Sequence, residues 1–205
     1  MKQPGESVAL LCPGPSLKRL WSEDLFKEYK EVVAVNTAGH VFRHHWLCGV
    51  DRHIYQPFLD GQIPLPLLGF LTHKSWANQI NKKFPEMIVH LPGPYFGDDI
   101  RPEVEKKMKT NRCGYTMPNA LWFCRSRYKT EEIHVYGFDV AIGSPDICNV
   151  TGDRKWLRFD RELIWLKEYW HKDILVNSDL SPEILAWLND GKLDLKPAPL
   201  EKPEE

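Results

Sequence analysis

Short apolar runs that do not alternate with polar residues recur along this chain, and they constrain its fold more than any other feature. VALLC (8–12) and EVVAVN (31–36) are the first two. A strand that is apolar on both sides must be buried on both faces, which is typical of parallel strands covered by helices. Further strands are expected at 45–51, 67–72, 86–91, 131–139 and 173–178, and helices at 17–29, 75–84 and 160–171. We therefore predict an α/β fold, Rossmann-like, with a mainly parallel sheet and helices on both faces.

The chain length of 205 residues suits one domain, which we expect to span 1–195. The tail 196–205 is rich in proline and charge and is expected to be disordered. The formal net charge of −1 argues against a protein built mainly to hold a DNA or RNA backbone.

Cysteine usage and hydropathy indicate the compartment. The five cysteines have no framework spacing, and Cys12, Cys48 and Cys124 lie in apolar contexts that predict small core residues. There is no apolar run of 18 residues, so no membrane span is expected, and the first seven residues carry no apolar signal region. We expect a cytoplasmic protein.

The stretch CPGPS (12–16) joins the first predicted strand to the first predicted helix. The unpaired N–H groups of a helix start attract anions, and Gly14 would let a phosphate approach the backbone. Pro15 lies beside it, and Ser16 is expected to cap the helix and to bond a ligand oxygen. An ordinary capped turn explains the same residues equally well.

Asn36 ends the second predicted strand, 22 residues after Gly14. In dinucleotide-binding folds a polar residue at this strand tip bonds a ribose, about 20 residues beyond the glycine turn. The alternative is that Asn36 caps a helix that starts at Thr37. The two features together favour a nucleotide site that includes Asn36 and Thr37.

Two acids close predicted strands, Asp51 in CGVD and Asp139 in VYGFD. Parallel strands end at the same edge of a sheet, so both carboxylates would face one site, as a base or as ligands of Mg²⁺. Helix capping is the plainer explanation for each.

A second polar helix start lies within TNRCGYTMPNALWFC (110–124). Gly114 precedes this helix, and polar groups at its start predict a further base- or anion-binding site. The candidates are Asn111, Cys113, Gly114, Tyr115 and Thr116. His40, His44, His45 and Cys48 are interpreted as helix-surface and packing residues, with metal binding as the less favoured alternative.

The set GPSL, VVAVN, a Gly-led helix and VYGFD, in this order over residues 7–140, resembles the superfamily of family-42 bacterial sialyltransferases. Motility-associated flagellin glycosyltransferases, archaeal 6-hydroxymethylpterin diphosphokinases and small bacterial and phage proteins share this pattern. The resemblance implies a Rossmann-like domain whose donor nucleotide meets Gly14, Pro15, Ser16 and Asn36. It also implies that Cys113-Gly114 stands where the sialyltransferases have Ser-Gly.

The resemblance includes two departures. The sialyltransferases have phosphate-binding tyrosines after the Gly-x-Asp and a histidine base in a lid, and this sequence has neither there. Residues 141–156 are expected to close over the ligand, with Arg154 and Lys155 on its phosphates, although a static loop is an equal alternative.

We therefore expect a glycosyltransferase-like enzyme that uses a nucleotide-sugar, with Asp139 or Asp51 as base and no redox cofactor. The acceptor is left open and includes glycans, modified nucleotides and DNA; an oligomer is also left open. A magnesium-dependent diphosphokinase-like enzyme and a nucleotide-binding protein without catalysis are the two alternatives.

Overall fold

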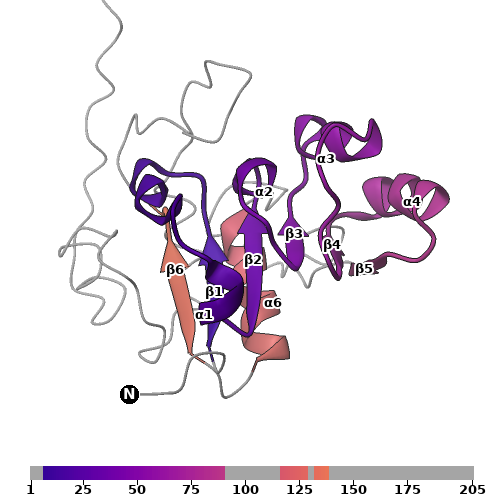
Figure 1. The fold of residues 1–205 in the computed structure, drawn as a ribbon. Helices are drawn as coiled ribbons and strands as arrows, with labels where there is room; N and C mark the ends of the chain where they lie inside the picture. The colour runs from indigo at the N-terminus through magenta and orange to yellow at the C-terminus, as the bar shows by residue number, and fades with distance from the viewer. Residues whose placement is uncertain (1–6, 91–115, 129–131, 139–205) are drawn as a thin grey trace, which may run out of the picture.

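The computed structural model describes residues 7–90, 116–128 and 132–138, and these build one parallel sheet (Figure 1). Its strand order is β5-β4-β3-β2-β1-β6, and every pairing is parallel. The strands are β1 (Val8–Leu11), β2 (Glu31–Val35), β3 (Trp46–Cys48), β4 (Gly69–Leu71), β5 (Ile88–His90) and β6 (Ile133–Tyr136). The predicted α/β class with a parallel sheet is confirmed.

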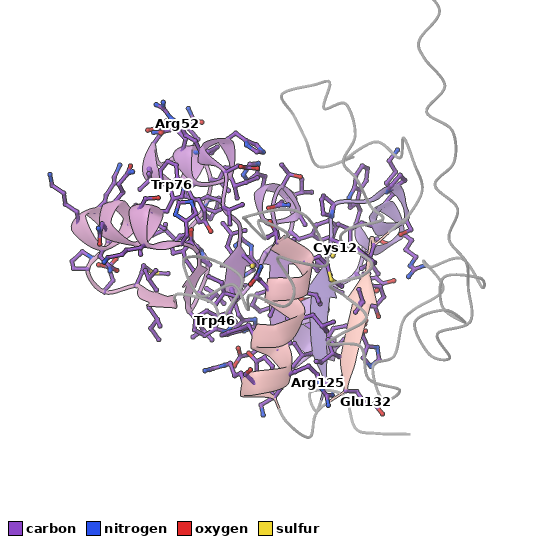
Figure 2. The ribbon with its side chains drawn as sticks, turned by 180° about the vertical axis from the view of Figure 1, so that it is seen from behind. Cys12, Trp46, Arg52, Trp76, Arg125 and Glu132 are labelled. Atoms are coloured by element: carbon purple, nitrogen blue, oxygen red, sulfur yellow. The ribbon has the colours of Figure 1, made fainter. Side chains whose placement is uncertain are left out.

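Helices cover both faces of this sheet, as Figures 1 and 2 show from opposite sides. One face packs against η1 (Pro15–Leu20), α1 (Leu25–Glu28), α2 (Ala38–Val41), α3 (Arg52–Leu59) and α4 (Lys74–Lys83). The other face packs against α6 (Thr116–Arg127). Alternate residues of β1 serve the two faces: Val8 and Leu10 pack with α6, whereas Ala9 and Leu11 pack with η1 and α1. This division explains why the strand is apolar at every position.

The single helix expected at 17–29 is wrong. The chain forms the 3₁₀ helix η1 and then the one-turn helix α1, with Asp24 before the latter. The buried side chains Leu17, Leu20 and Leu25 explain the break, because the step of five residues from 20 to 25 does not fit a 3.6-residue period. The helix and strand expected at 160–171 and 173–178, and the tail, lie outside the described residues.

The cysteine interpretation is confirmed for the residues that the structure describes. Cys12, Cys48 and Cys124 are buried and carry free thiols. Burial raises the pKa of the Cys48 and Cys124 thiols, which therefore behave as small core groups.

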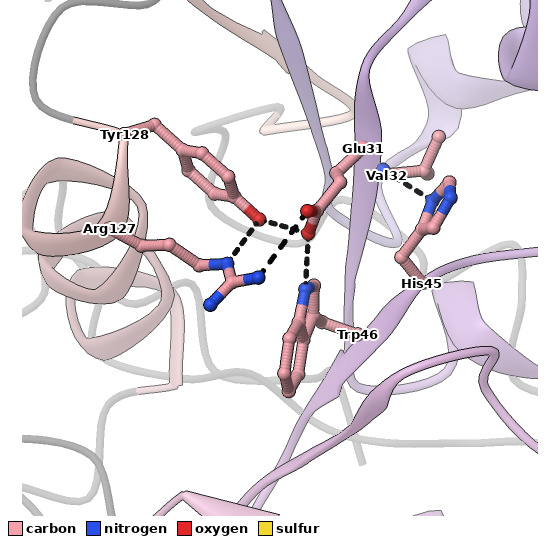
Figure 3. Close-up of polar contacts among 6 residues, drawn as sticks. All are labelled: Glu31, Val32, His45, Trp46, Arg127 and Tyr128. Atoms are coloured by element: carbon pink, nitrogen blue, oxygen red, sulfur yellow. Dashed lines mark hydrogen bonds and ion pairs between the residues drawn. The ribbon is translucent and has the colours of Figure 1, made fainter. Parts of the chain in front are cut away.

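A polar cluster at the amino end of β2 fastens α6 to the sheet (Figure 3). The Glu31 carboxylate accepts hydrogen bonds from the Tyr128 hydroxyl and the Trp46 indole N–H. The Arg127 guanidinium lies 3.5 Å from Glu31, and its Nε donates to Tyr128 at 3.1 Å. Burial and the bond to Glu31 raise the pKa of Tyr128, so the phenol stays protonated and keeps donating.

We predict that Tyr128→Phe lowers the free energy of unfolding by about 1.5–3 kcal/mol, because it removes a bond to a charged group. Tyr29→Phe is the matched control. It removes the hydrogen bonds of the Tyr29 hydroxyl with the Tyr136 hydroxyl and with His134 Nδ1, neither of which involves a carboxylate, and should cost about 0.5–1.5 kcal/mol. Urea unfolding measures both, and a Tyr128→Phe loss no larger than that of Tyr29→Phe would contradict this role of Glu31.

Candidate functional site

The sheet changes direction at β1, and this fixes where a ligand should bind. From β1 the chain adds β2, β3, β4 and β5 on one side, and β6 then joins the opposite side of β1. In open parallel sheets ligands bind outside the carboxyl ends of the strands where the strand order reverses. The candidate site is therefore the carboxyl edge around β1, β2 and β6.

Two backbone hydrogen bonds join the segments that leave β1 and β6 at this edge. Cys12 N–H donates to the Tyr136 carbonyl, and Gly14 N–H donates to the Gly137 carbonyl, both at 2.8 Å. Gly137 has a φ of +67°, and a Cβ added there would lie 2.0 Å from the Cys12 carbonyl oxygen. Only glycine meets both conditions, so Gly137 fixes how the two segments approach each other.

The role of Gly137 was not predicted from the sequence, because a glycine after a strand, as in VYGFD, is common. The signal is present in the sequence as a glycine directly between the last strand residue and the predicted acid. The sequence alone does not show that the Cys12 carbonyl lies against Gly137, because this depends on the pairing of β6 with β1.

The turn after β1 differs from the prediction in one respect. The N-cap residue of η1 is Gly14, with Pro15 at the first helical position, so the expected cap at Ser16 is wrong. Gly14 has φ −74° and ψ 164°, an extended conformation open to any residue, and the cap makes no side-chain hydrogen bond. Proline is preorganised for that first position, which explains why η1 starts there.

Asn36 lies at the tip of β2, as predicted. Its φ of +51° is the one positive value outside glycine among the described residues. Its N–H donates to the Cys48 carbonyl at 2.8 Å, and its own carbonyl accepts from the Gly39 N–H at 3.2 Å. The side-chain Oδ1 is buried and has no hydrogen-bond partner among the described residues. The N-cap residue of α2 is the buried Thr37, so the alternative that Asn36 caps this helix is wrong.

Asp51 follows β3 at the same edge, at the N-cap position of α3, with no side-chain capping bond. It is exposed. Three side chains hold the backbone just before it. Tyr55 OH donates to the Gly49 carbonyl at 2.6 Å, and the Val50 carbonyl accepts from Trp76 Nε1 at 3.0 Å and from His73 Nε2 at 3.2 Å. Trp76 belongs to α4, and its ring stacks on that of Tyr55 from α3, with 5.7 Å between the ring centres.

Thr116 is the remaining predicted residue that the structure describes. It is buried at the start of α6, and its carbonyl accepts a weak bond from the Cys48 thiol at 3.6 Å. The structure thus attaches this helix start to β3. The other predicted site residues lie outside the described residues: Asn111, Cys113, Gly114, Tyr115, Asp139, Arg154 and Lys155.

The histidines after β2 make structural bonds. His40 Nε2 pairs with the Ile54 carbonyl at 3.0 Å, and His44 Nδ1 pairs with the Phe42 carbonyl at 2.7 Å. His45 Nδ1 accepts the Val32 N–H at 3.0 Å. Within the described part of the chain, no three His, Cys, Asp or Glu side chains are grouped to hold a metal ion.

A cleft of about 400 Å³ lies between α2 and the segment 63–67. Its lining is largely apolar and includes the half-exposed Val41 and Leu67. Burial lowers the pKa of His44, which also lines it, to about 4, so this imidazole is neutral at pH 7. None of the residues predicted for the nucleotide site lines this cleft.

Comparisons with models of protein families, with curated proteins and with solved structures give no match to this chain. Among the described helices, none has the length and apolar character needed to cross a membrane. The case for a function therefore rests on the geometry of the carboxyl edge.

We predict that Gly137→Ala destabilises the protein more than Gly61→Ala does. The two glycines have similar φ values, +67° and +72°, but a Cβ at Gly61 meets nothing within 4 Å. Gly61→Ala should cost about 1–2 kcal/mol for the left-handed backbone. Gly137→Ala should cost about 1–3 kcal/mol more, because the new Cβ overlaps a backbone oxygen. Equal losses in urea unfolding would show that the junction of β1 and β6 tolerates the extra atom.

Proposed function

We propose that this chain binds a nucleotide at the carboxyl edge of its sheet and transfers a sugar from a nucleotide-sugar donor to a hydroxyl acceptor. The observation that carries the proposal is Asn36, whose strained backbone presents a buried amide oxygen without a partner in the described structure. The resemblance to the sialyltransferase-like superfamily supports the same reaction class.

The Asn36 backbone is fixed on both sides by the bonds to Cys48 and Gly39. A left-handed asparagine costs free energy, and so does a buried acceptor without a donor, about 1–3 kcal/mol for the latter. Such costs cluster at binding sites, where a ligand supplies the missing partner. Ribose hydroxyls and base amino groups are donors of the right kind, and strand tips beside a glycine turn are where nucleotides present them.

The acid at the neighbouring strand tip suggests how transfer would proceed. Asp51 is an exposed carboxylate on backbone that Tyr55, His73 and Trp76 hold in place. In the proposed reaction the acceptor oxygen forms a bond to the anomeric carbon while the bond from that carbon to the donor's phosphate oxygen breaks. The acceptor proton passes to the carboxylate, and the nucleoside phosphate leaves. Asp139, directly after the described Phe138, is the second candidate for this role.

The two alternative functions use the same nucleotide site but differ in what happens to the bound nucleotide. A diphosphokinase-like enzyme would need Mg²⁺ and would consume ATP, with Asp51 as one oxygen ligand. A protein without catalysis would bind the nucleotide and return it unchanged. Product analysis after incubation with each nucleotide-sugar and with ATP, in the presence and absence of Mg²⁺, separates the three.

We predict that Asn36→Gly weakens nucleotide binding about 5- to 150-fold, the equivalent of about 1–3 kcal/mol for a lost buried hydrogen bond. Glycine accepts the positive φ, so the variant should stay folded. A thermal-shift panel of CMP-, UDP-, GDP- and dTDP-sugars, ATP and GTP selects the ligand, and calorimetry then measures its affinity.

Asn36→Asp is the matched variant, since it keeps an oxygen acceptor at the same place. It should bind more tightly than Asn36→Gly. Unchanged affinity in Asn36→Gly would remove Asn36 from the site and with it the main support for the proposed function.

A further inference from the structure

The turn between β1 and η1 has few backbone donors for a phosphate. Pro13 and Pro15 have no N–H, and the Gly14 N–H is already bonded to the Gly137 carbonyl at 2.8 Å. Leu17 N–H bonds back to the Gly14 carbonyl at 3.1 Å. Cys12 N–H, at the start of the turn, donates to the Tyr136 carbonyl at 2.8 Å, which leaves Ser16 as the one other residue from 12 to 17 with an N–H. A phosphate-binding turn aims several N–H groups at one anion, and the bonds within this protein use most of them here.

The helix that follows the turn does not compensate. η1 is a 3₁₀ helix of only six residues. Its basic residues Lys18 and Arg19 lie in the last turn, and the Arg19 guanidinium lies over the Tyr136 ring, 5.5 Å from the ring centre. A short 3₁₀ helix also sums few peptide dipoles, so the positive end of its dipole is weak.

Two acceptor groups lie at the neighbouring strand tips. Asn36 Oδ1 is a buried amide oxygen without a partner in the described structure, and Asp51 is an exposed carboxylate. At neutral pH a phosphate is itself mainly an acceptor of hydrogen bonds and carries negative charge. It therefore gains nothing from Asn36 Oδ1 and is repelled by Asp51, whereas the hydroxyl and amino groups of a nucleoside can donate to both.

We propose that the described carboxyl edge recognises the nucleoside of the ligand, and that the turn after β1 does not hold the phosphates. This inference rests on the proposed function. It reverses the expectation from the sequence, in which residues 13–16 cradle the phosphates. The phosphates lie beyond this turn, and the affinity that Asn36 contributes is the same for a nucleoside and for its diphosphate.

Two variants test this assignment with adenosine, cytidine, guanosine and uridine and their 5′-diphosphates as probes. Gly14→Ala adds a Cβ where a phosphate would have to approach the backbone, and the extended conformation of Gly14 admits alanine. Asn36→Gly removes the amide. Ligand-observed NMR measures the weak complexes and calorimetry the tight ones, and thermal unfolding confirms that both variants are folded.

We expect Gly14→Ala to change the affinity ratio of diphosphate to nucleoside by less than about threefold. We expect Asn36→Gly to weaken nucleoside and diphosphate alike, by at least about fivefold, the lower end for a lost buried hydrogen bond. This inference would be overturned if Gly14→Ala weakened the affinity for the diphosphate alone by tenfold or more. The proposed function would still stand. If no probe binds the wild-type protein, the proposed function fails, and this inference fails with it.

Discussion

The contact between the turn after β1 and the segment after β6 is the constraint on which the candidate site depends. Two N–H···O bonds of 2.8 Å join the segments, and Gly137 approaches the Cys12 carbonyl too closely for a side chain. β6 is separated from β1 by more than 100 residues, so this junction forms only when β6 pairs with β1. It also uses the Gly14 N–H, and thereby limits what the turn can offer a ligand.

The strand tips at this carboxyl edge present different chemical groups. The β1 turn is occupied by its own hydrogen bonds, the β2 tip presents a buried acceptor in Asn36, and the β3 tip presents the exposed Asp51. Hydrogen bonds from Tyr55, His73 and Trp76 restrain the backbone just before Asp51. The backbone position from which the Asp51 side chain extends is therefore fixed. At the opposite edge Glu31 holds α6 with Tyr128, Arg127 and Trp46, a cluster that stabilises the helix and lies away from the site.

The sequence predicts those features that depend on local pattern. Uninterrupted apolar runs located the described strands, and the position of Asn36 at a strand tip followed directly from the end of such a run. The prediction of one helix at 17–29 is wrong because the buried Leu20 and Leu25 are five residues apart, a spacing that does not place them on one face of an α-helix. The cap at Ser16 failed because Pro15 can itself begin a helix.

Features that depend on distant parts of the chain could not be predicted. The pairing of Gly14 with Gly137 joins residues far apart in sequence, and so does the bond from Cys48 to Thr116. The missing partner of Asn36 Oδ1 likewise appears only when every neighbour has a position. The sequence therefore indicates the position of Asn36 at a strand tip, but not its positive φ or its unpartnered Oδ1.

A crystal structure with the tightest-binding nucleotide would show whether Asn36 binds the nucleoside. We predict that a ribose hydroxyl or a base amino group lies within about 3.2 Å of Asn36 Oδ1, at hydrogen-bond distance. We also predict that no phosphate oxygen contacts the turn at 13–16. A nucleotide bound in the cleft beside α2, or an Asn36 Oδ1 bonded to the protein's own chain in the complex, would contradict the proposed site.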